Sequence, residues 1–211
     1  MTTIRILAVD DHPLLREGIA ALISGQDDMT LAGEASTGAE AIHQFRSVRP
    51  DITLLDIQMP GMSGIDALSA IRHEFPEARI IILTTYGGDV LAQRALKAGA
   101  LAYVLKGAVR RELLDTIRAV HLGHRRIPAE VASMLAAHRG DEGLSQREVE
   151  VLALVASGNS NREIGMRLAI TEETIKAHMK RIAAKLGAND RTHAVTLALG
   201  RGILSIDPSA K

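Results

Sequence analysis

The feature that most constrains the fold is the alternation of short apolar runs with amphipathic stretches over the first 122 residues. The runs are rich in Ile, Leu or Val and occupy 4–10, 31–35, 51–56, 80–84 and 100–105. Stretches with helical periodicity follow them at 13–24, 37–47, 64–74, 88–98 and 109–122. Short, continuously apolar runs are typical of strands buried on both faces. The alternation therefore predicts a doubly wound α/β domain, with a five-stranded parallel sheet and right-handed crossovers.

The second half of the chain has a different pattern and predicts a separate all-α domain. No strand-like run follows Leu144, and helical periodicity occupies 146–157, 161–168, 172–186 and 191–201. The segment 125–143 contains one short helical pattern, 128–138, and ends in a polar, Gly-containing stretch. We interpret it as a linker. The expected organisation is an α/β domain over 1–124, a linker over 125–143 and a four-helix domain over 144–211.

Several helix ends are marked by the residues that cap them. Three pairs have the spacing of a capping box, in which a hydroxyl and a carboxylate three residues later satisfy each other's backbone donors. These pairs are Thr37–Glu40, Ser145–Glu148 and Ser160–Glu163. Gly158 and Gly187 suit the left-handed conformation that follows many helices.

Composition excludes several classes of protein. The chain of 211 residues has no Cys, which excludes disulfides, zinc–thiolate sites and thiol catalysis. Its formal net charge is zero, so total charge indicates neither a nucleic-acid nor a membrane partner. No apolar run approaches the roughly 18 residues that a membrane-spanning helix needs. The N-terminus lacks the pattern of a secretory signal. We therefore expect a cytoplasmic protein without a membrane partner.

Four of the predicted strands in the first domain end on polar residues that complement one another in charge. These residues are Asp10 and Asp11, Asp56, Thr84 and Lys106. In open parallel sheets, ligands bind outside the carboxyl ends of the strands. One Asp after a strand is usually a turn former or a helix cap. The combination at four strand ends instead predicts a site for a divalent cation and a phosphoryl group.

The chemistry of that site follows from its residue types. Magnesium takes oxygen ligands and is usually held by one or two carboxylates, water and phosphate oxygens. Asp11 and Asp56 supply such carboxylates, with Asp10 acting through water. Lys106 is a compact charge for a phosphate or carboxylate oxygen, and Thr84 offers a hydroxyl donor. Asp56 is the natural nucleophile, and its product is an aspartyl phosphate.

The segment 172–186 has the pattern of a DNA-reading helix. A short link precedes it, as in a helix-turn-helix. One face carries Ile175, Met179, Ile182 and Leu186, and the other carries Lys176, Ala177 and Lys180. Between 171 and 187, four basic residues, which include Arg181 and Lys185, and two glutamates give a local charge of +2. A lysine-bearing face often only confers solubility. Here, however, an excess of positive charge occurs locally in a chain of zero net charge, which favours contact with a nucleic acid.

The first domain resembles the receiver domain of two-component response regulators, which has the flavodoxin/CheY-like fold. The resemblance rests on VDDHPLLREG, LLDIQMPGMSG, IIILTTY and KAGALAYVLK, across about residues 3–122. It implies that Asp56 accepts the phosphoryl group from a histidine kinase. It also implies Mg²⁺ ligation by Asp10, Asp11, Asp56 and the Gln58 carbonyl, and a switch formed by Thr84, Lys106 and Tyr103. Gly107 departs from the family, where many receivers have proline after the lysine.

The second domain resembles the LuxR-type (NarL/FixJ) helix-turn-helix domain over about residues 144–204. This resemblance implies that 172–186 is the recognition helix and that 191–201 mediates dimerisation on double-stranded DNA. Lys176, Ala177 and Lys180 match the family's contact positions, and His178 occupies a position that is commonly histidine. Asn161 and Arg162 lie at a helix N-terminus, where backbone N–H groups favour phosphate.

Two other functions stay open from the sequence. The acidic pocket also suits a magnesium-dependent aspartyl-phosphate phosphatase. Such an enzyme usually needs an acid/base carboxylate two residues after the nucleophile, and Gln58 stands there. A regulator that binds DNA without phosphorylation is the second alternative, although the acidic pocket is complete. We expect a non-enzymatic, phosphorylation-controlled transcription factor.

Overall fold

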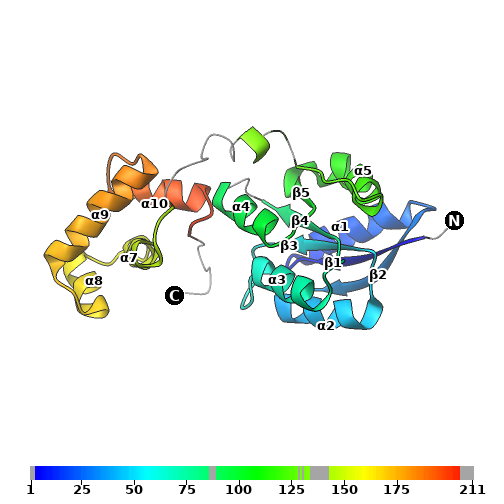
Figure 1. Cartoon of the computed structure of the whole chain (residues 1–211), viewed down its shortest axis with the longest axis horizontal. Coiled ribbons are helices and arrows are strands. Elements are labelled where there is room, and N and C mark those ends of the chain that lie inside the picture. The colour runs from blue at the N-terminus through cyan, green and yellow to red at the C-terminus, as the bar shows by residue number, and fades with distance from the viewer. Residues whose placement is uncertain (1–2, 86–88, 128, 130, 134–142, 205–211) are drawn as a thin grey trace. The chain divides into compact units, whose positions relative to one another are not determined.

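The structure is a computed structural model that describes residues 3–85, 89–127, 129, 131–133 and 143–204 (Figure 1). The chain divides into two compact units. The first extends to Met134 and the second starts at Leu135, except that Gly88–Leu91 is grouped with the second. No helix in the described ranges is both long and apolar enough to cross a membrane.

The first unit contains the predicted five-stranded parallel sheet. Its strands are β1 (Ile4–Val9), β2 (Met29–Ala35), β3 (Ile52–Asp56), β4 (Ile80–Thr84) and β5 (Ala102–Leu105). The strand order is β2-β1-β3-β4-β5, with every pair parallel. Strands β3 and β4 are buried along their whole length, as expected from their predominantly apolar sequences.

Helices cover both faces of this sheet. They are α1 (Pro13–Ser24), α2 (Gly38–Val48), α3 (Gly64–Glu74), α4 (Asp89–Lys97) and α5 (Val109–His121). The apolar side chains of α1 and α5 form one core cluster with Ile6, Leu54 and Leu83 of the sheet. Helices α2 and α3 lie on the opposite face (Figure 1). This is the doubly wound arrangement that the sequence predicts.

Three details of the first unit differ from the sequence predictions or lie outside them. A 3₁₀ helix, η1 (Lys106–Ala108), follows β5 at the position of Gly107. The Thr37 hydroxyl accepts a hydrogen bond from Glu40 N–H, as expected. The Glu40 carboxylate, however, accepts hydrogen bonds from the N–H and the hydroxyl of Ser36, the residue before the cap Thr37. Most of the predicted helix 128–138 lies outside the described residues. Within this range, residues 129 and 131–133 are described and are helical.

The second unit has the four predicted helices: α7 (Gln146–Ala156), α8 (Asn161–Leu168), α9 (Glu172–Leu186) and α10 (Arg191–Gly200). Both serine capping boxes are present, at Ser145–Glu148 and Ser160–Glu163. The α8–α9 turn is tight, because a Cβ added at Gly165 would lie 2.7 Å from the Ile170 carbonyl oxygen. Ala169 completes this turn in the left-handed conformation, with φ of 53°.

One apolar core holds the four helices together. It contains Val151, Leu152, Ile164, Ile175, Ile182 and Ala194, all fully buried. Because α9 contributes Ile175, Ile182 and Leu186 to this core, its opposite face is left at the surface. The inward face of α9 is therefore the one that the sequence predicts.

Candidate functional site

The sheet register brings the polar strand ends of the first unit together. Val9 of β1 pairs with Leu55 of β3, so Asp10 and Asp56 follow as neighbours at the carboxyl edge. Asp56 pairs with Leu83 of β4, and Thr84 is the next residue. Thr84 pairs with Leu105 of β5, which directly precedes Lys106. Four strands thus deliver their polar groups to one edge because they are parallel and in register.

Lys106 links two buried carboxylates at this edge. Its Nζ lies 2.7 Å from Asp10 Oδ2 and donates a hydrogen bond of 2.9 Å to Asp56 Oδ2. Asp10 is fully buried and Asp56 is 1% exposed. An uncompensated pair of buried carboxylates is strongly unfavourable, so the Lys106 ammonium stabilises this arrangement.

The protonation equilibria of the site reflect burial and this ion pair. Burial raises the pKa of Asp56 to about 6, against the lowering effect of the Lys106 ammonium. Burial by itself lowers the pKa of Lys106, but its hydrogen bonds to Asp10 and Asp56 outweigh that effect and raise the pKa above 10.5. Lys106 is therefore charged at neutral pH, and Asp56 is an unusually basic carboxylate. Such shifts are typical of functional sites.

The loop after β3 packs tightly against the Asp56 backbone. The Gln58 N–H donates to Asp56 Oδ1 at 3.3 Å, and the Gly64 N–H donates to the Ile57 carbonyl at 2.9 Å. A Cβ added at Gly64 would lie 1.8 Å from the Asp56 carbonyl oxygen. Gly64 is thus required for this close approach, which holds Gln58 beside Asp56.

The acidic end of the sheet has donor atoms suited to a hard divalent cation. Asp10, Asp11, His12 and Asp56 each place one ligand atom within 4.8 Å of the others. Asp10 Oδ2 is a buried atom 2.7 Å from the Lys106 nitrogen, and Asp11 Oδ1 is a buried atom 2.7 Å from His12 Nδ1. Three carboxylates gathered at one point match the oxygen ligands that Mg²⁺ prefers, so these residues fit the ion.

Thr84 and Tyr103 lie side by side in the interior. Both are 1% exposed. Burial raises the pKa of Tyr103 to about 12, against the lowering effect of a hydrogen bond with Thr84. Tyr103 also lines a cavity of about 340 Å³ with Glu112 and Thr116 of α5 and with residues 125–127 and 129. The ring therefore has space beside it.

The segment after α5 is attached to β5 next to Tyr103. The Tyr103 N–H donates to the Arg126 carbonyl at 3.0 Å, and the Arg126 N–H donates to the Leu101 carbonyl at 3.1 Å. Arg126 thereby forms a parallel bridge with Ala102 at the sheet edge. This bridge lies in the segment predicted as a linker, 125–143, and the sequence does not predict it because a single paired residue has no period-2 pattern.

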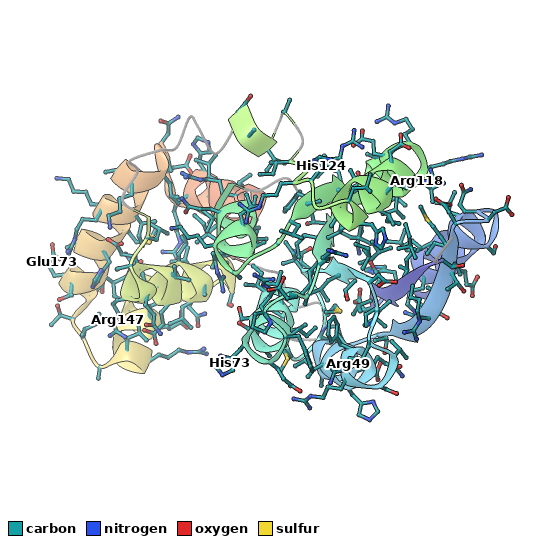
Figure 2. The ribbon with its side chains drawn as sticks, turned by 45° about the vertical axis from the view of Figure 1, so that its right-hand side comes forward. Arg49, His73, Arg118, His124, Arg147 and Glu173 are labelled. Carbon is teal, nitrogen blue, oxygen red and sulfur yellow. The ribbon has the colours of Figure 1, made fainter. Side chains whose placement is uncertain are left out.

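In the second unit, α9 exposes the predicted basic face. Lys176, Ala177, Lys180 and Arg181 are exposed. Lys176 Nζ lies 3.5 Å from Glu172 Oε1 and 3.3 Å from Glu173 Oε2 at the start of the helix. Figure 2 shows Glu173 at the outer surface of α9. The two glutamates thus pair with the Lys176 ammonium.

Lys185 has a structural partner that the sequence analysis missed. Its Nζ donates to Glu148 Oε2 at 2.8 Å, and Glu148 is 3% exposed. The same Glu148 oxygen caps Ser145 N–H at 2.8 Å. Burial raises the pKa of Glu148, but the bonds from Lys185 and Ser145 prevail and lower it below 4.5. The capping-box spacing marked Glu148, but nothing local linked it to a lysine 37 residues away.

Of the other residues predicted to contact DNA, Asn161 and Arg162 lie at the N-terminus of α8, and His178 lies within α9. Arg191 donates to Asn161 Oδ1 at 2.8 Å and also to the Asn159 carbonyl. Arg162 is exposed, whereas His178 is half-buried and its Nδ1 is a buried atom without a hydrogen bond in the described residues. Asn161, Lys180 and Arg191 also line a cavity of about 280 Å³ beside α9. The structure thus brings Asn161 and Lys180 to one surface.

The fold and the two surfaces define a class of protein: a phosphoacceptor-type α/β domain followed by a helix-turn-helix domain. Comparison with known families agrees with this division. Residues 6–118 match the family described as the response regulator receiver domain. Residues 142–198 match the family described as bacterial regulatory proteins, luxR family. The chain therefore belongs to the response regulators that carry a luxR-type DNA-binding domain.

The chain is similar to transcriptional regulators over nearly their whole length. The chain is 39% identical over 203 residues to the transcriptional regulatory protein LiaR of Bacillus subtilis, covering 92% of this chain and 96% of LiaR. It is 35% identical to the response regulator protein VraR of Staphylococcus aureus, covering 96% and 99%. A solved structure of RcsB from Salmonella enterica serovar Typhimurium, bound to a promoter with the phosphomimetic BeF₃⁻, has a TM-score of 0.72. That structure shares 26% identity and covers 95% of this chain and 100% of its own.

Proposed function

We propose that this protein is a transcription factor whose sequence-specific DNA binding is controlled by phosphorylation of Asp56. The observation that carries the proposal is the buried Asp10–Lys106–Asp56 arrangement, in one chain with the exposed basic face of α9. A histidine kinase is the proposed phosphoryl donor. The proposed domain limits are 1–124, 125–143 and 144–211.

Asp56 is the proposed phosphoacceptor. A carboxylate oxygen of Asp56 attacks phosphorus, the P–O bond forms, and the P–N bond to the donor's imidazole breaks as a proton moves to the leaving nitrogen. Asp10, Asp11, Asp56 and the Gln58 carbonyl are the proposed Mg²⁺ ligands. The ion, when bound, neutralises charge on the incoming phosphoryl oxygens. The Lys106 ammonium, already 2.9 Å from Asp56, is placed to pair with one of those oxygens.

Thr84 and Tyr103 are proposed to transmit the change. A phosphoryl oxygen at Asp56 offers the Thr84 hydroxyl a stronger, charged acceptor than the Tyr103 hydroxyl does. Loss of the Thr84 bond frees the Tyr103 ring to move relative to the cavity beside it. Because the Tyr103 N–H is bonded to Arg126, such a movement reaches the start of the linker.

This route is tested by Arg126→Pro, which removes the hydrogen bond from the Arg126 N–H to the Leu101 carbonyl. The variant should still be phosphorylated, but phosphorylation should change its DNA affinity less than it changes that of wild type. An unchanged effect of phosphorylation on DNA affinity would exclude this route.

The exposed face of α9 is the proposed DNA-reading surface. Lys176, Ala177 and Lys180 are proposed to face the bases and backbone of the DNA. A second group is proposed to contact phosphate or to orient the side chains that do so: Arg181, Asn161, Arg162 and His178. The promoter-bound structure of RcsB supports this assignment by family. A phosphate contact by Lys185 stays a prediction, and its bond to Glu148 favours a structural role. Binding as a homodimer through α10 is also proposed.

The phosphoacceptor assignment is tested by labelling with acetyl phosphate. Wild type should gain one phosphoryl group in intact-mass spectra only when Mg²⁺ is present. Asp56→Asn should remain unlabelled, whereas Asp115→Asn, which changes an exposed carboxylate on α5, should label like wild type. Labelling of Asp56→Asn would overturn the assignment.

The DNA-reading face is tested by the salt dependence of binding. Lys176→Ala with Lys180→Ala should weaken binding and flatten the slope of log affinity against log salt by about 2, because each lost phosphate contact lowers it by about one. Lys97→Ala, an exposed lysine of α4, is the matched control. An unchanged slope in the double variant would exclude this face.

Two further aspects of the function are proposed on weaker structural support. The protein is proposed to act in the cytoplasm, where promoter DNA lies, and not as an enzyme on a separate substrate. Gln58 supports the second point, because it stands where an aspartyl phosphatase has its acid/base carboxylate. Turnover of a phosphate ester, measured with p-nitrophenyl phosphate, would favour the enzyme instead.

A further inference from the structure

Arg191 connects the first turn of α10 to the start of α8. Its guanidinium donates a hydrogen bond of 2.8 Å to Asn161 Oδ1 and a second bond to the Asn159 carbonyl. Asn159 is itself anchored, because its Nδ2 donates to the Leu154 carbonyl at 2.8 Å. Arg191 and Asn161 are both half-buried. The planar guanidinium thus holds the Asn161 side chain against an anchored part of the α7–α8 link.

The bond from Arg191 determines how the Asn161 amide is oriented. A guanidinium carries only donors, so the amide atom that it contacts must be the acceptor oxygen. The Nδ2 group, with its two N–H donors, therefore lies on the side of the amide away from Arg191. It donates no hydrogen bond to another residue in the described part of the chain. Asn161 thus offers two unused donors in a fixed orientation.

The charges around this pair favour an anion. Asn161 and Arg191 are the first residues of α8 and α10, and helix N-termini carry a partial positive charge. Both line the cavity of about 280 Å³ together with the exposed Lys180 of α9. Asp190 also lines it, but its Oδ1 accepts the His193 N–H as the cap of α10. A cation in the first turn is unfavourable for α10 itself, so helix stability does not explain Arg191.

We propose that Arg191 is a positioning residue for DNA binding, which orients the Asn161 amide so that Nδ2 donates to a phosphate oxygen of the DNA backbone. Phosphate oxygens are acceptors, so they match the two donors that the amide presents. Because Arg191 already restricts the Asn161 side chain, less rotamer freedom is lost on binding. The inference rests on the proposed function, because it concerns the DNA-binding surface that includes Lys180.

Two other roles for Arg191 make different predictions. If the guanidinium paired directly with a phosphate, its loss would flatten the slope of log affinity against log salt by about one. If it only joined the helices, its loss would change the free energy of unfolding but not the DNA affinity of the folded protein. A positioning residue acts through Asn161, so its loss should have little further effect once the amide is absent.

The test uses the full-length chain, treated with acetyl phosphate and Mg²⁺, and a duplex that this protein captures from fragmented genomic DNA. Asn161→Ala and Arg191→Met should each raise the Kd at least about tenfold, as expected for one hydrogen bond to a charged group. The double variant should bind within about twofold of the weaker single variant. The salt slope of Arg191→Met should change by less than about 0.5. Arg167→Met, which removes an exposed arginine of α8, is the matched control and should bind like wild type.

Nuclear magnetic resonance of the wild type adds a measurement that does not depend on how Arg191→Met folds. The side-chain amide signal of Asn161, identified by its loss in Asn161→Ala, should shift when the duplex is added. An amide signal that does not shift, wild-type affinity in Arg191→Met, additive losses in the double variant, or a slope flattened by about one would overturn the inference and leave the proposed function standing. Failure of wild type to bind any genomic fragment would overturn both.

Discussion

Replacing the buried Asp56 carboxylate by the neutral amide of asparagine should stabilise the receiver domain at pH 8 in metal-free buffer. The side chain is 1% exposed, and burial raises its pKa from 3.8 to about 6. An acid whose pKa is higher in the folded state contributes stability at low pH and loses it as the pH rises through the folded value. Asparagine keeps the neutral form at every pH, so it avoids this loss.

The size of the effect follows from the two pKa values. Each unit corresponds to about 1.36 kcal/mol, so the shift from 3.8 to about 6 destabilises the folded wild type by about 3 kcal/mol above pH 7. At pH 5, near the middle of the interval between the two pKa values, the same values give a destabilisation of about 1.6 kcal/mol. Lys106 remains paired with Asp10 at 2.7 Å in the variant, so the ammonium is not left alone.

Differential scanning calorimetry of the full-length chain measures this directly. With chelator at pH 8, the receiver transition of Asp56→Asn should lie on the order of 10 °C above that of wild type. The gain should be about half as large at pH 5 and should shrink when Mg²⁺ is added at pH 8, because the ion binds the ionised wild type. Asp115→Asn, which removes an exposed carboxylate, should show no such gain. A variant that is no more stable at pH 8, or equally stabilised at both pH values, would refute the reasoning.

Three other substitutions test the framework around the two surfaces. Gly64→Ala puts a Cβ 1.8 Å from the Asp56 carbonyl oxygen, so it should lower receiver stability by about 3 kcal/mol in calorimetry and reduce acetyl phosphate labelling; normal labelling would contradict the close approach. Lys185→Met leaves buried Glu148 without its ammonium and should destabilise the helical domain by about 2 kcal/mol in urea unfolding, with recovery in the double variant that also carries Glu148→Gln. Ala169→Gly should raise the stability of that domain by about 1 kcal/mol, because φ of 53° is strained for alanine; a loss would show that the strain is absent.

The elements, and the gathering of Asp10, Asp56 and Lys106 at one edge of the sheet, could be predicted because their signals are local. The runs that become β3 and β4 are short and rich in Ile and Leu, and the carboxyl edge of a parallel sheet brings Asp56 and Lys106 together. The exposed face of α9 follows in the same way from the spacing of its buried residues.

Contacts between distant residues could not be predicted, because no periodicity marks them. The Lys185–Glu148 pair spans 37 residues and the Arg191–Asn161 bond spans 30. A count of basic residues along α9 treats Lys185 as equivalent to Lys180. Only the packing of the helices shows that Lys185 is directed to a buried carboxylate. The bridge at Arg126 is equally invisible, because it is one residue of irregular chain against β5.

The central claim is that phosphorylation of Asp56 controls DNA binding through α9. It is tested most directly by capturing fragmented genomic DNA with full-length wild type, with and without acetyl phosphate and Mg²⁺, and with Asp56→Asn. Phosphorylated wild type should enrich a defined set of fragments that share one sequence motif, while Asp56→Asn and untreated wild type should enrich them at least about tenfold less. Equal enrichment of the same fragments by all three samples would contradict control by phosphorylation.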